Sequence, residues 1–199
     1  MKPAYRSLPL HRLDRGIRPA RPKQQLPWRI TADDPALSVM TDLCQVAAVT
    51  TELLTPLDQG LDIMIKRGVR VLLVVDADDH ILGLVTSRDI DGEKAHRIFA
   101  KAGCSREDLF VSDVMTLRAK LEVLMMEDLL TARVGDIIAT LRQVNRQHAL
   151  VLEIDPETEI PAVRGLFSLS EIGLRLGLDI SPSRQPTTYA ELEKAGVVL

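Results

Sequence analysis

Two short apolar segments separated by a polar turn form the clearest pattern along the chain. Val71–Val75 is continuously apolar and rich in β-branched residues, which predicts a buried strand. The polar cluster Asp76–Asp79 favours a turn, and Ile81–Val85 predicts the returning strand of a hairpin. At Thr86 the apolar period changes, and a hydroxyl residue at this point favours the N-cap of a helix.

A helix is predicted just before this hairpin. Its apolar positions recur at helical spacing, at Leu57, Leu61, Met64 and Ile65. Thr55 is suited to the N-cap and Pro56 to the first helical position, and Gly68 marks the end of the helix. Because Val46–Thr50 also predicts a short strand, the expected order is strand, helix, hairpin and helix.

The same order of elements occurs a second time. Val39–Thr41 and Val114–Thr116 both read Val-Met-Thr, which marks an internal repeat. In the second copy we expect a strand at Leu121–Met125, a helix at Val134–Gln147, hairpin strands at Ala149–Ile154 and Val163–Phe167, and a last helix completed by Ile172–Leu178.

The end of the first hairpin resembles a known family. Gly83–Asp89 reads G-L-V-T-S-R-D, which is similar to the Gly-apolar-x-Thr/Ser-x-x-Asp signature of CBS (cystathionine β-synthase) domains. Thr55–Arg70 resembles the first helix of such a domain. The resemblance implies an α/β (α+β) fold in which two β-α-β-β-α CBS repeats pack sheet to sheet around a pseudo-twofold axis. We expect a standalone tandem CBS-domain protein, with a basic arm at residues 1–35, repeats at 36–109 and 110–178, and a linker with a short helix at 179–199.

The resemblance also implies a ligand, because family members bind adenosyl compounds in the cleft between repeats. In this chain, Asp89 would accept hydrogen bonds from ribose hydroxyls and Thr86 would meet the phosphate. Arg88 or Arg70 would neutralise that phosphate, and the strand that reaches Thr51 would line the base. The expected ligand is AMP, ADP, ATP or S-adenosylmethionine, with no cofactor required. Independently of the family, the first N–H groups of a helix have no intrahelical partner and favour an anion.

The second signature departs from the first. Gly165–Glu171 reads G-L-F-S-L-S-E, so Ser168 keeps the hydroxyl, Ser170 takes the place of Arg88, and Glu171 takes the place of the aspartate. The additional methylene moves the carboxylate by ~1.5 Å, and we therefore expect a weaker second site at Ser168 and Glu171. This degeneracy leaves an alternative open, namely a ligand-free dimerisation or interaction scaffold that contacts an acidic partner or nucleic acid through its basic arm.

Composition and motifs favour a binding protein over an enzyme. The chain is 46% hydrophobic but only 3% aromatic, which predicts an aliphatic core. No Ser-His-Asp arrangement or P-loop is recognisable, so we expect no catalytic residues. Cys44 and Cys104 lack metal-ligand spacing, so no metal is expected, and His148 is interpreted as a boundary residue before a strand. No segment approaches the ~20 apolar residues of a membrane span, which predicts a cytoplasmic protein with no membrane partner.

The N-terminal arm differs in charge from the body of the protein. Residues 1–30 contain eight Lys or Arg and one acid, whereas the whole chain carries a net charge of −3. The first interpretation is that the arm contacts nucleic acid or an acidic partner. The second is that it is a solubilising tail, or that it packs on the acidic body of this chain or of a dimer mate. We favour the second interpretation, since no nucleic-acid motif accompanies the charge. Trp28 and Ile30 indicate that the end of the arm is anchored on an apolar surface.

These observations together predict a regulatory module. A chain without an active site produces an output only through a change of conformation or pairing. We therefore expect a homodimer that signals in trans to an unidentified effector protein. At the C-terminus, Thr188 and Glu191 predict a capping box for a short helix.

Overall fold

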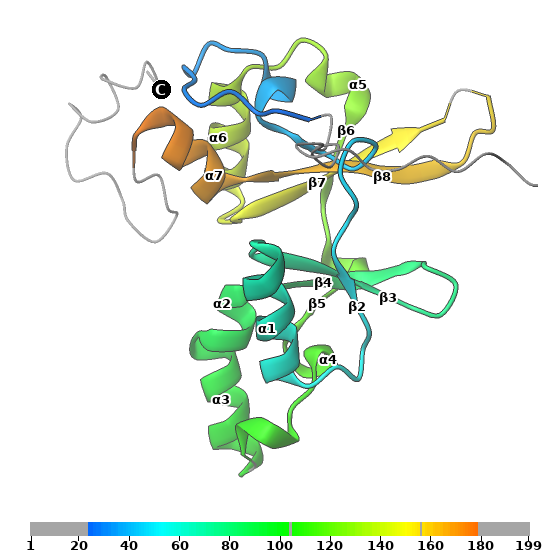
Figure 1. Ribbon diagram of the computed structural model, residues 1–199, viewed down its shortest axis with the longest axis vertical. Helices are drawn as coiled ribbons and strands as arrows, with labels where there is room; N and C mark the ends of the chain where they lie inside the picture. Colours follow the sequence, from blue (N-terminus) through cyan, green and yellow to red (C-terminus); the bar gives the residue numbers. More distant parts are fainter. Residues whose placement is uncertain (1–23, 104, 156, 179–199) are drawn as a thin grey trace, which may run out of the picture.

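The computed structural model describes residues 24–103, 105–155 and 157–178. Within these residues two four-stranded sheets, each accompanied by helices, lie one above the other (Figure 1). The strands are β1 (Thr41–Asp42), β2 (Thr50–Thr51), β3 (Val71–Val75), β4 (Ile81–Thr86), β5 (Thr116–Leu117), β6 (Val123–Met125), β7 (His148–Ile154) and β8 (Pro161–Ser168). The α-helices are α1 (Leu57–Arg67), α2 (Ser87–Asp91), α3 (Glu93–Ala102), α4 (Val111–Val114), α5 (Met126–Leu129), α6 (Val134–Gln143) and α7 (Leu169–Leu176). Short 3-10 helices are η1 (Ala36–Val39), η2 (Arg106–Asp108) and η3 (Arg118–Lys120).

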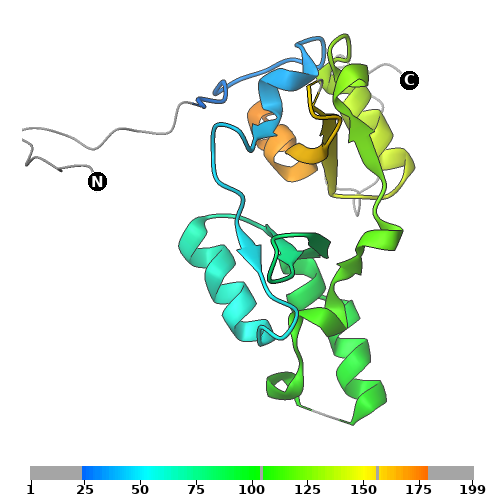
Figure 2. The ribbon, with the colours of Figure 1, turned by 90° about the vertical axis from the view of Figure 1, so that its right-hand side faces the viewer.

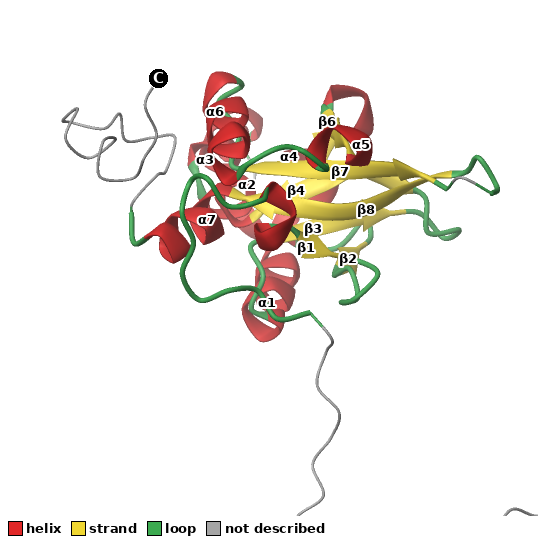
Figure 3. Cartoon of the chain, turned by 90° about the horizontal axis from the view of Figure 1, so that it is seen from above, coloured by secondary structure: helices red, strands yellow, loops and turns green. Residues whose placement is uncertain are grey.

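The two sheets have the same topology, which confirms the α/β fold of two related halves. In one sheet the order is β2-β3-β4-β5, and in the other it is β6-β7-β8-β1. Each begins with a parallel pair, β2 with β3 and β6 with β7, and continues with antiparallel neighbours. The long β7–β8 hairpin extends away from α6 and α7 (Figure 3).

Each sheet is completed by a strand from the beginning of the other repeat. β1 begins the first repeat but pairs with β8, where Thr41 lies opposite Leu166. β5 begins the second repeat but pairs with β4, where Thr116 lies opposite Leu84. The segments that connect the sheets, residues 43–49 and 118–122, lie at opposite edges of the molecule in the view of Figure 2. The Val-Met-Thr segments therefore link the two halves.

Three buried apolar clusters account for the packing of these layers. One lies between the first sheet and its helices and contains Leu72, Val74 and Leu57, and a second lies under α6 and α7. The third lies between the two sheets, where Leu73, Leu84 and Leu150 are buried together. Successive residues of a strand point to opposite faces, so β3 directs Leu72 and Val74 toward the helices and Leu73 toward the other sheet. The expected packing of sheet on sheet is built on this alternation.

Several local predictions are confirmed by the backbone. The hairpin of β3 and β4 forms as expected, and α1 ends at Gly68, whose φ of 66° is the left-handed conformation favoured for glycine. Ser105 and Asp108 form the expected capping interaction at η2.

Several element boundaries differ from the predictions. The N-cap of α1 is Pro56 rather than Thr55, whose hydroxyl instead accepts a 2.9 Å hydrogen bond from Thr51. The strand expected at Val46–Thr50 is Thr50–Thr51, since only these two residues pair with β3. Helix α6 stops at Gln143 instead of Gln147.

The early end of α6 has a clear cause. Asn145 adopts a positive φ of 52°, and the N–H of Arg146 then bonds to the carbonyl of Leu141 at 2.9 Å. Asparagine tolerates this left-handed conformation better than most residues. The helix therefore closes before the chain reaches β7.

The end of the N-terminal arm is anchored, but not by Trp28. Ile30 is buried in the cluster under α6 and α7, whereas Trp28 is 89% exposed, so the predicted anchoring role of Trp28 is wrong. Gln24 holds the segment through hydrogen bonds to the carbonyl of Met40 and the N–H of Asp42. Polar contacts of Gln24 to β1 thus hold this described end of the arm, while the indole ring lies in solvent.

Some predictions concern residues outside the described ranges. These are the structure of residues 1–23, the capping box of Thr188 and Glu191 within residues 179–199, and the environment of Cys104. Among the residues that are described, no helix combines the length and apolar character that a membrane span requires.

Candidate functional site

Two cavities lie where the two sheets face one another, and each contains one signature. We call them the Asp89 cavity, with a volume of about 310 Å³, and the Glu171 cavity, with a volume of about 670 Å³. Both volumes fall within the ~300–1,000 Å³ range of small-molecule sites in proteins.

The Asp89 cavity is built from both repeats. The first repeat contributes Thr86, Arg88 and Asp89 from the end of β4 and the start of α2. The second repeat forms the opposite wall with residues 122–124 at β6 and residues 145–150, which run from the turn after α6 into β7. A molecule in this cavity would contact both halves of the fold at once.

In the Glu171 cavity the contributions of the two repeats are exchanged. Here the second repeat contributes Ser168, Ser170 and Glu171, and the first repeat contributes residues 46–49 before β2 and residues 67–71 between α1 and β3. Leu26 of the N-terminal arm also lines this cavity. Each signature therefore faces the first strand and helix end of the other repeat.

As a result, residues that the sequence predicts for a single site do not all line the same cavity. Arg70 was expected beside Thr86 and Asp89, but it lines the Glu171 cavity. Its carbonyl does accept a 3.0 Å hydrogen bond from the N–H of Ser87, so the backbones are adjacent although the cavities are distinct. Thr51 is buried at β2 and lines neither of the two cavities.

Thr86 and Asp89 bind each other reciprocally at the start of α2. One carboxylate oxygen of Asp89, Oδ2, accepts hydrogen bonds from the Thr86 N–H at 2.9 Å and from the Thr86 hydroxyl at 2.7 Å. The N–H of Asp89 donates to the Thr86 hydroxyl oxygen at 3.2 Å. The other oxygen, Oδ1, lies 3.3 Å from the ammonium nitrogen of Lys94. The carboxylate is thus positioned firmly at the cavity wall by a capping box.

The second signature is held differently. The N–H of Glu171 lies 3.4 Å from the Ser168 hydroxyl, and that hydroxyl lies 3.0 Å from the hydroxyl of Ser170. The Glu171 carboxylate does not return to the backbone of Ser168 but pairs with Arg175 at 2.5 Å. The Glu171 side chain therefore does not cap the helix but forms an ion pair with Arg175 along α7.

His148 is a cavity residue that the sequence interpretation missed. It is the first residue of β7 and lines both cavities, and its Nδ1 is buried with no hydrogen-bond partner in the described structure. Burial lowers the pKa of His148 to about 4, with Asp89 opposing this shift and Arg70 and Arg88 adding to it. Comparison of the two repeats could have indicated this residue. The first copy has an apolar residue, Val71, at the start of β3, where the second copy has His148 at the start of β7.

Arginines outnumber acidic residues in the walls of the two cavities. Arginines line both of them, and these are Arg67, Arg70, Arg88 and Arg146. The acids are Asp89, Glu122 and Glu171, of which Asp89 and Glu171 are already paired with Lys94 and Arg175. The described walls of these two cavities thus carry four arginines against three acids, an excess of positive charge toward a bound molecule.

The family is decided by the sequence around the first signature. Residues 37–105 match the family model of the CBS domain. This segment of the chain is a CBS domain. The match extends from η1 to just before η2 and includes the whole Gly83–Asp89 signature. The search of curated proteins found no match.

The chain is similar to solved structures from three organisms, and the first of them shows the same fold. An uncharacterized conserved protein from Pyrococcus horikoshii is 19% identical with a TM-score of 0.52, and the alignment covers 80% of this chain and all of that one. A putative signal-transduction protein with CBS domains from Burkholderia ambifaria is 24% identical, with a TM-score of 0.46 and coverage of 63% and 79%. CBSX2 of Arabidopsis thaliana, solved in complex with AMP, is 17% identical, with a TM-score of 0.44 and coverage of 70% and 93%.

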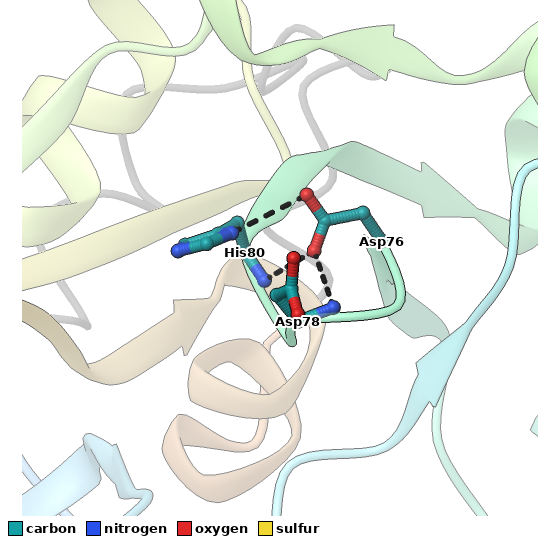
Figure 4. A group of neighbouring side chains, drawn as sticks. All are labelled: Asp76, Asp78 and His80. Carbon is teal, nitrogen blue, oxygen red and sulfur yellow. Dashed lines mark hydrogen bonds and ion pairs between the residues drawn. The ribbon is translucent and has the colours of Figure 1, made fainter.

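One cluster of metal-ligand type lies away from the cavities of the CBS-domain protein. Asp76, Asp78 and His80 lie together at the β3–β4 turn (Figure 4). The Asp76 carboxylate accepts hydrogen bonds from the N–H groups of His80 and Asp78, which hold its pKa below the ordinary value, and it pairs with the His80 ring at 3.3 Å. These contacts explain the cluster as the closure of a turn.

Proposed function

We propose that this CBS-domain protein is a regulatory module that senses an adenosyl nucleotide in the Asp89 cavity. The observation that carries the proposal is the mixed origin of the cavity walls, with Arg88 and Asp89 from one repeat and Arg146 and His148 from the other. A ligand that contacts both walls binds best when the repeats are correctly placed. Its binding energy therefore favours one arrangement of the repeats over others.

The lining residues suit the chemistry of a nucleoside phosphate. Asp89 Oδ1 can accept hydrogen bonds from ribose hydroxyls, and Arg88 and Arg146 supply donors and positive charge for phosphate oxygens. Leu84, Leu121 and Leu150 add apolar surface of the kind on which a base packs. AMP, ADP, ATP and S-adenosylmethionine all combine these groups, and they are the proposed ligand class.

The proposed output is conformational and not catalytic. The residues of the Asp89 cavity offer binding groups for a ligand, and Asp89 is engaged as a helix cap rather than poised as a base. We propose that the module pairs into a homodimer, occupies the cytoplasm and passes its change of shape to an effector protein in trans.

One observation favours the alternative of a ligand-free scaffold. Both carboxylate oxygens of Asp89 already have partners, Oδ2 with Thr86 and Oδ1 with Lys94. A ribose that binds Asp89 must therefore share or displace the Lys94 ammonium group. If that cost exceeds the gain from the ribose and phosphate, the cavity remains unused and the fold serves only to hold partners together.

A thermal-shift panel separates these two functions. The protein is heated with AMP, ADP, ATP and S-adenosylmethionine in turn. A ligand at 100 times its Kd stabilises the folded state by about 2.7 kcal/mol, or roughly 5–11 °C in Tm for a chain of this size. A shift of this kind with at least one compound supports sensing, and the absence of any shift supports the scaffold.

A matched pair of variants locates the site. Asp89→Asn removes a helix-capping carboxylate that lines the Asp89 cavity, whereas Asp113→Asn removes one that caps α4 through the Phe110 N–H and lines neither cavity. Both should lower the basal Tm, but only Asp89→Asn should abolish the ligand-induced shift. An unchanged shift in Asp89→Asn would place the ligand elsewhere.

A further inference from the structure

His148 lies at the junction of the two cavities. Of the residues that the structure describes, this one alone lines both the Asp89 cavity and the Glu171 cavity. It lies directly opposite Ser168 in the β7–β8 ladder, which places the second signature beside it. A change in the charge of its ring therefore alters the electrostatic potential in both cavities.

The ring has a defined protonation state in the unliganded fold. A neutral imidazole carries one N–H donor and one acceptor nitrogen. A buried donor without a partner is costly, so the proton of a neutral ring belongs on Nε2 and the buried Nδ1 remains an unprotonated acceptor. Protonation of the ring would place a second, unpaired donor in the buried position, so this position favours the neutral form.

The charged groups around the ring come from several elements. From the Asp89 cavity they are Arg88, Asp89, Glu122 and Arg146, and from the Glu171 cavity they are Arg67, Arg70 and Glu171. Of these groups, Asp89 favours a charged ring, whereas Arg70 and Arg88 oppose it. An anion bound among these arginines would offset their charge and so favour a charged imidazole.

We propose that His148 is a ligand-contacting residue shared by both cavities, and that it takes up a proton when a phosphate group binds in the cleft. This inference rests on the proposed function and names the phosphate as the recognised part of the ligand. The ring donates from Nε2 to a phosphate oxygen, and the anion then stabilises the imidazolium form. Affinity for a phosphorylated ligand consequently increases as the pH falls, and a ligand in one cavity alters the charge of a wall of the other.

Two variants separate the hydrogen bond from the proton uptake. His148→Gln retains a donor of similar reach but cannot take up a proton between pH 5 and 8. His148→Val removes both properties and introduces the residue that the first repeat has at Val71. His96→Gln, on the exposed surface of α3 and outside both cavities, is the matched control.

The test is isothermal titration of AMP into each protein at pH 7.5 and pH 5.5, in buffers of different ionisation enthalpy. The AMP phosphate itself titrates near pH 6, so the readout is the difference between the wild type and His148→Gln. If phosphate restores the pKa of His148 to its ordinary value, the ratio of the two Kd values changes about tenfold between these pH values. About one additional proton is then taken up by the wild type at pH 5.5, and His96→Gln behaves as the wild type.

The outcomes distinguish the inference from the function on which it rests. AMP binding with the same pH dependence in the wild type and His148→Gln would overturn the role of His148 alone. No heat of binding with AMP at either pH would overturn this inference together with a phosphate-binding Asp89 cavity. Unchanged affinity in His148→Val, with a normal circular dichroism spectrum and melting curve, would show that the ring does not contact the ligand.

Discussion

The backbone of Gly83 lies so close to the carbonyl of Thr116 that a Cβ atom on Gly83 would be 2.3 Å from that oxygen. The two residues belong to β4 and β5, where the second repeat donates a strand to the first sheet. Gly165 and Thr41 repeat the arrangement in the other sheet, with a distance of 2.7 Å. The glycine that opens each signature thus makes room for the exchanged strand.

Replacement of either glycine by alanine should therefore weaken the link between the halves. We expect Gly83→Ala and Gly165→Ala each to lower the free energy of unfolding by about 2–3 kcal/mol, because backbone must move to relieve the overlap. Gly135→Ala is the control, since its Cβ would meet its nearest neighbour at 3.4 Å and would stabilise helix α6. Urea denaturation measures all three, and an equal loss in all of them would contradict this explanation.

The two N-caps should differ in strength. Thr86→Ala removes a hydroxyl that both donates to Asp89 and accepts from its N–H, so we expect a loss of about 1–2 kcal/mol. Ser168→Ala removes a weaker cap, whose N–H···O distance is 3.4 Å, and should cost about half as much. Chemical denaturation of the two variants checks this order, and a larger loss at Ser168 would contradict it.

Asp42 anchors the exchanged strand β1 through a network of polar contacts. Burial alone would raise the pKa of this carboxyl, but hydrogen bonds from Gln45, the Cys44 N–H and Arg164 outweigh it and lower the pKa. A lowered pKa means that the charged form stabilises the fold above the ordinary value of 3.8 and that this contribution is lost as the pH falls through the folded-state value.

Removal of this charge should destabilise the protein at neutral pH. We expect Asp42→Asn to cost about 2–3 kcal/mol, because Arg164 is left partly buried beside a neutral group. A double-mutant cycle with Arg164→Met measures the coupling between the two residues. A coupling energy near zero would show that the pair contributes nothing beyond the separate side chains.

His148 should make the unliganded protein sensitive to mild acid. Its folded-state pKa of about 4 lies below the ordinary value of 6.5, so the unfolded chain binds more protons between these values. Stability therefore falls as the pH decreases from about 6.5 to about 4, by up to ~3 kcal/mol from this group. Thermal melts of the wild type and His148→Gln across this range check the prediction, and parallel curves would contradict it.

The sequence predicted those features that depend on neighbouring residues. The β3–β4 hairpin, the glycine end of α1 and the hydroxyl cap at Thr86 follow from local period and local hydrogen bonding. The relation between the repeats also followed, because Val-Met-Thr and the signature occur twice in the same order.

The composition of the cavities could not be predicted in the same way. Periodicity shows which face of an element is buried, but it does not show which repeat provides the opposite wall. Arg70 was therefore assigned to the cavity of Asp89, although the exchange of strands places it in the cavity of Glu171. His148 was missed for the same reason, since a polar residue at the start of a strand is ordinarily a boundary residue and only the packing of the sheets places it in the cleft.

The central claim is that one ligand is held by both repeats in the Asp89 cavity. Titration calorimetry with AMP on the wild type, Arg88→Gln and Arg146→Gln tests it directly, because Arg88 belongs to the first repeat and Arg146 to the second. We predict that each substitution raises the Kd by about tenfold or more through the loss of a charge-assisted hydrogen bond. A loss of affinity confined to one variant, or no binding by the wild type, would contradict a ligand that bridges the repeats.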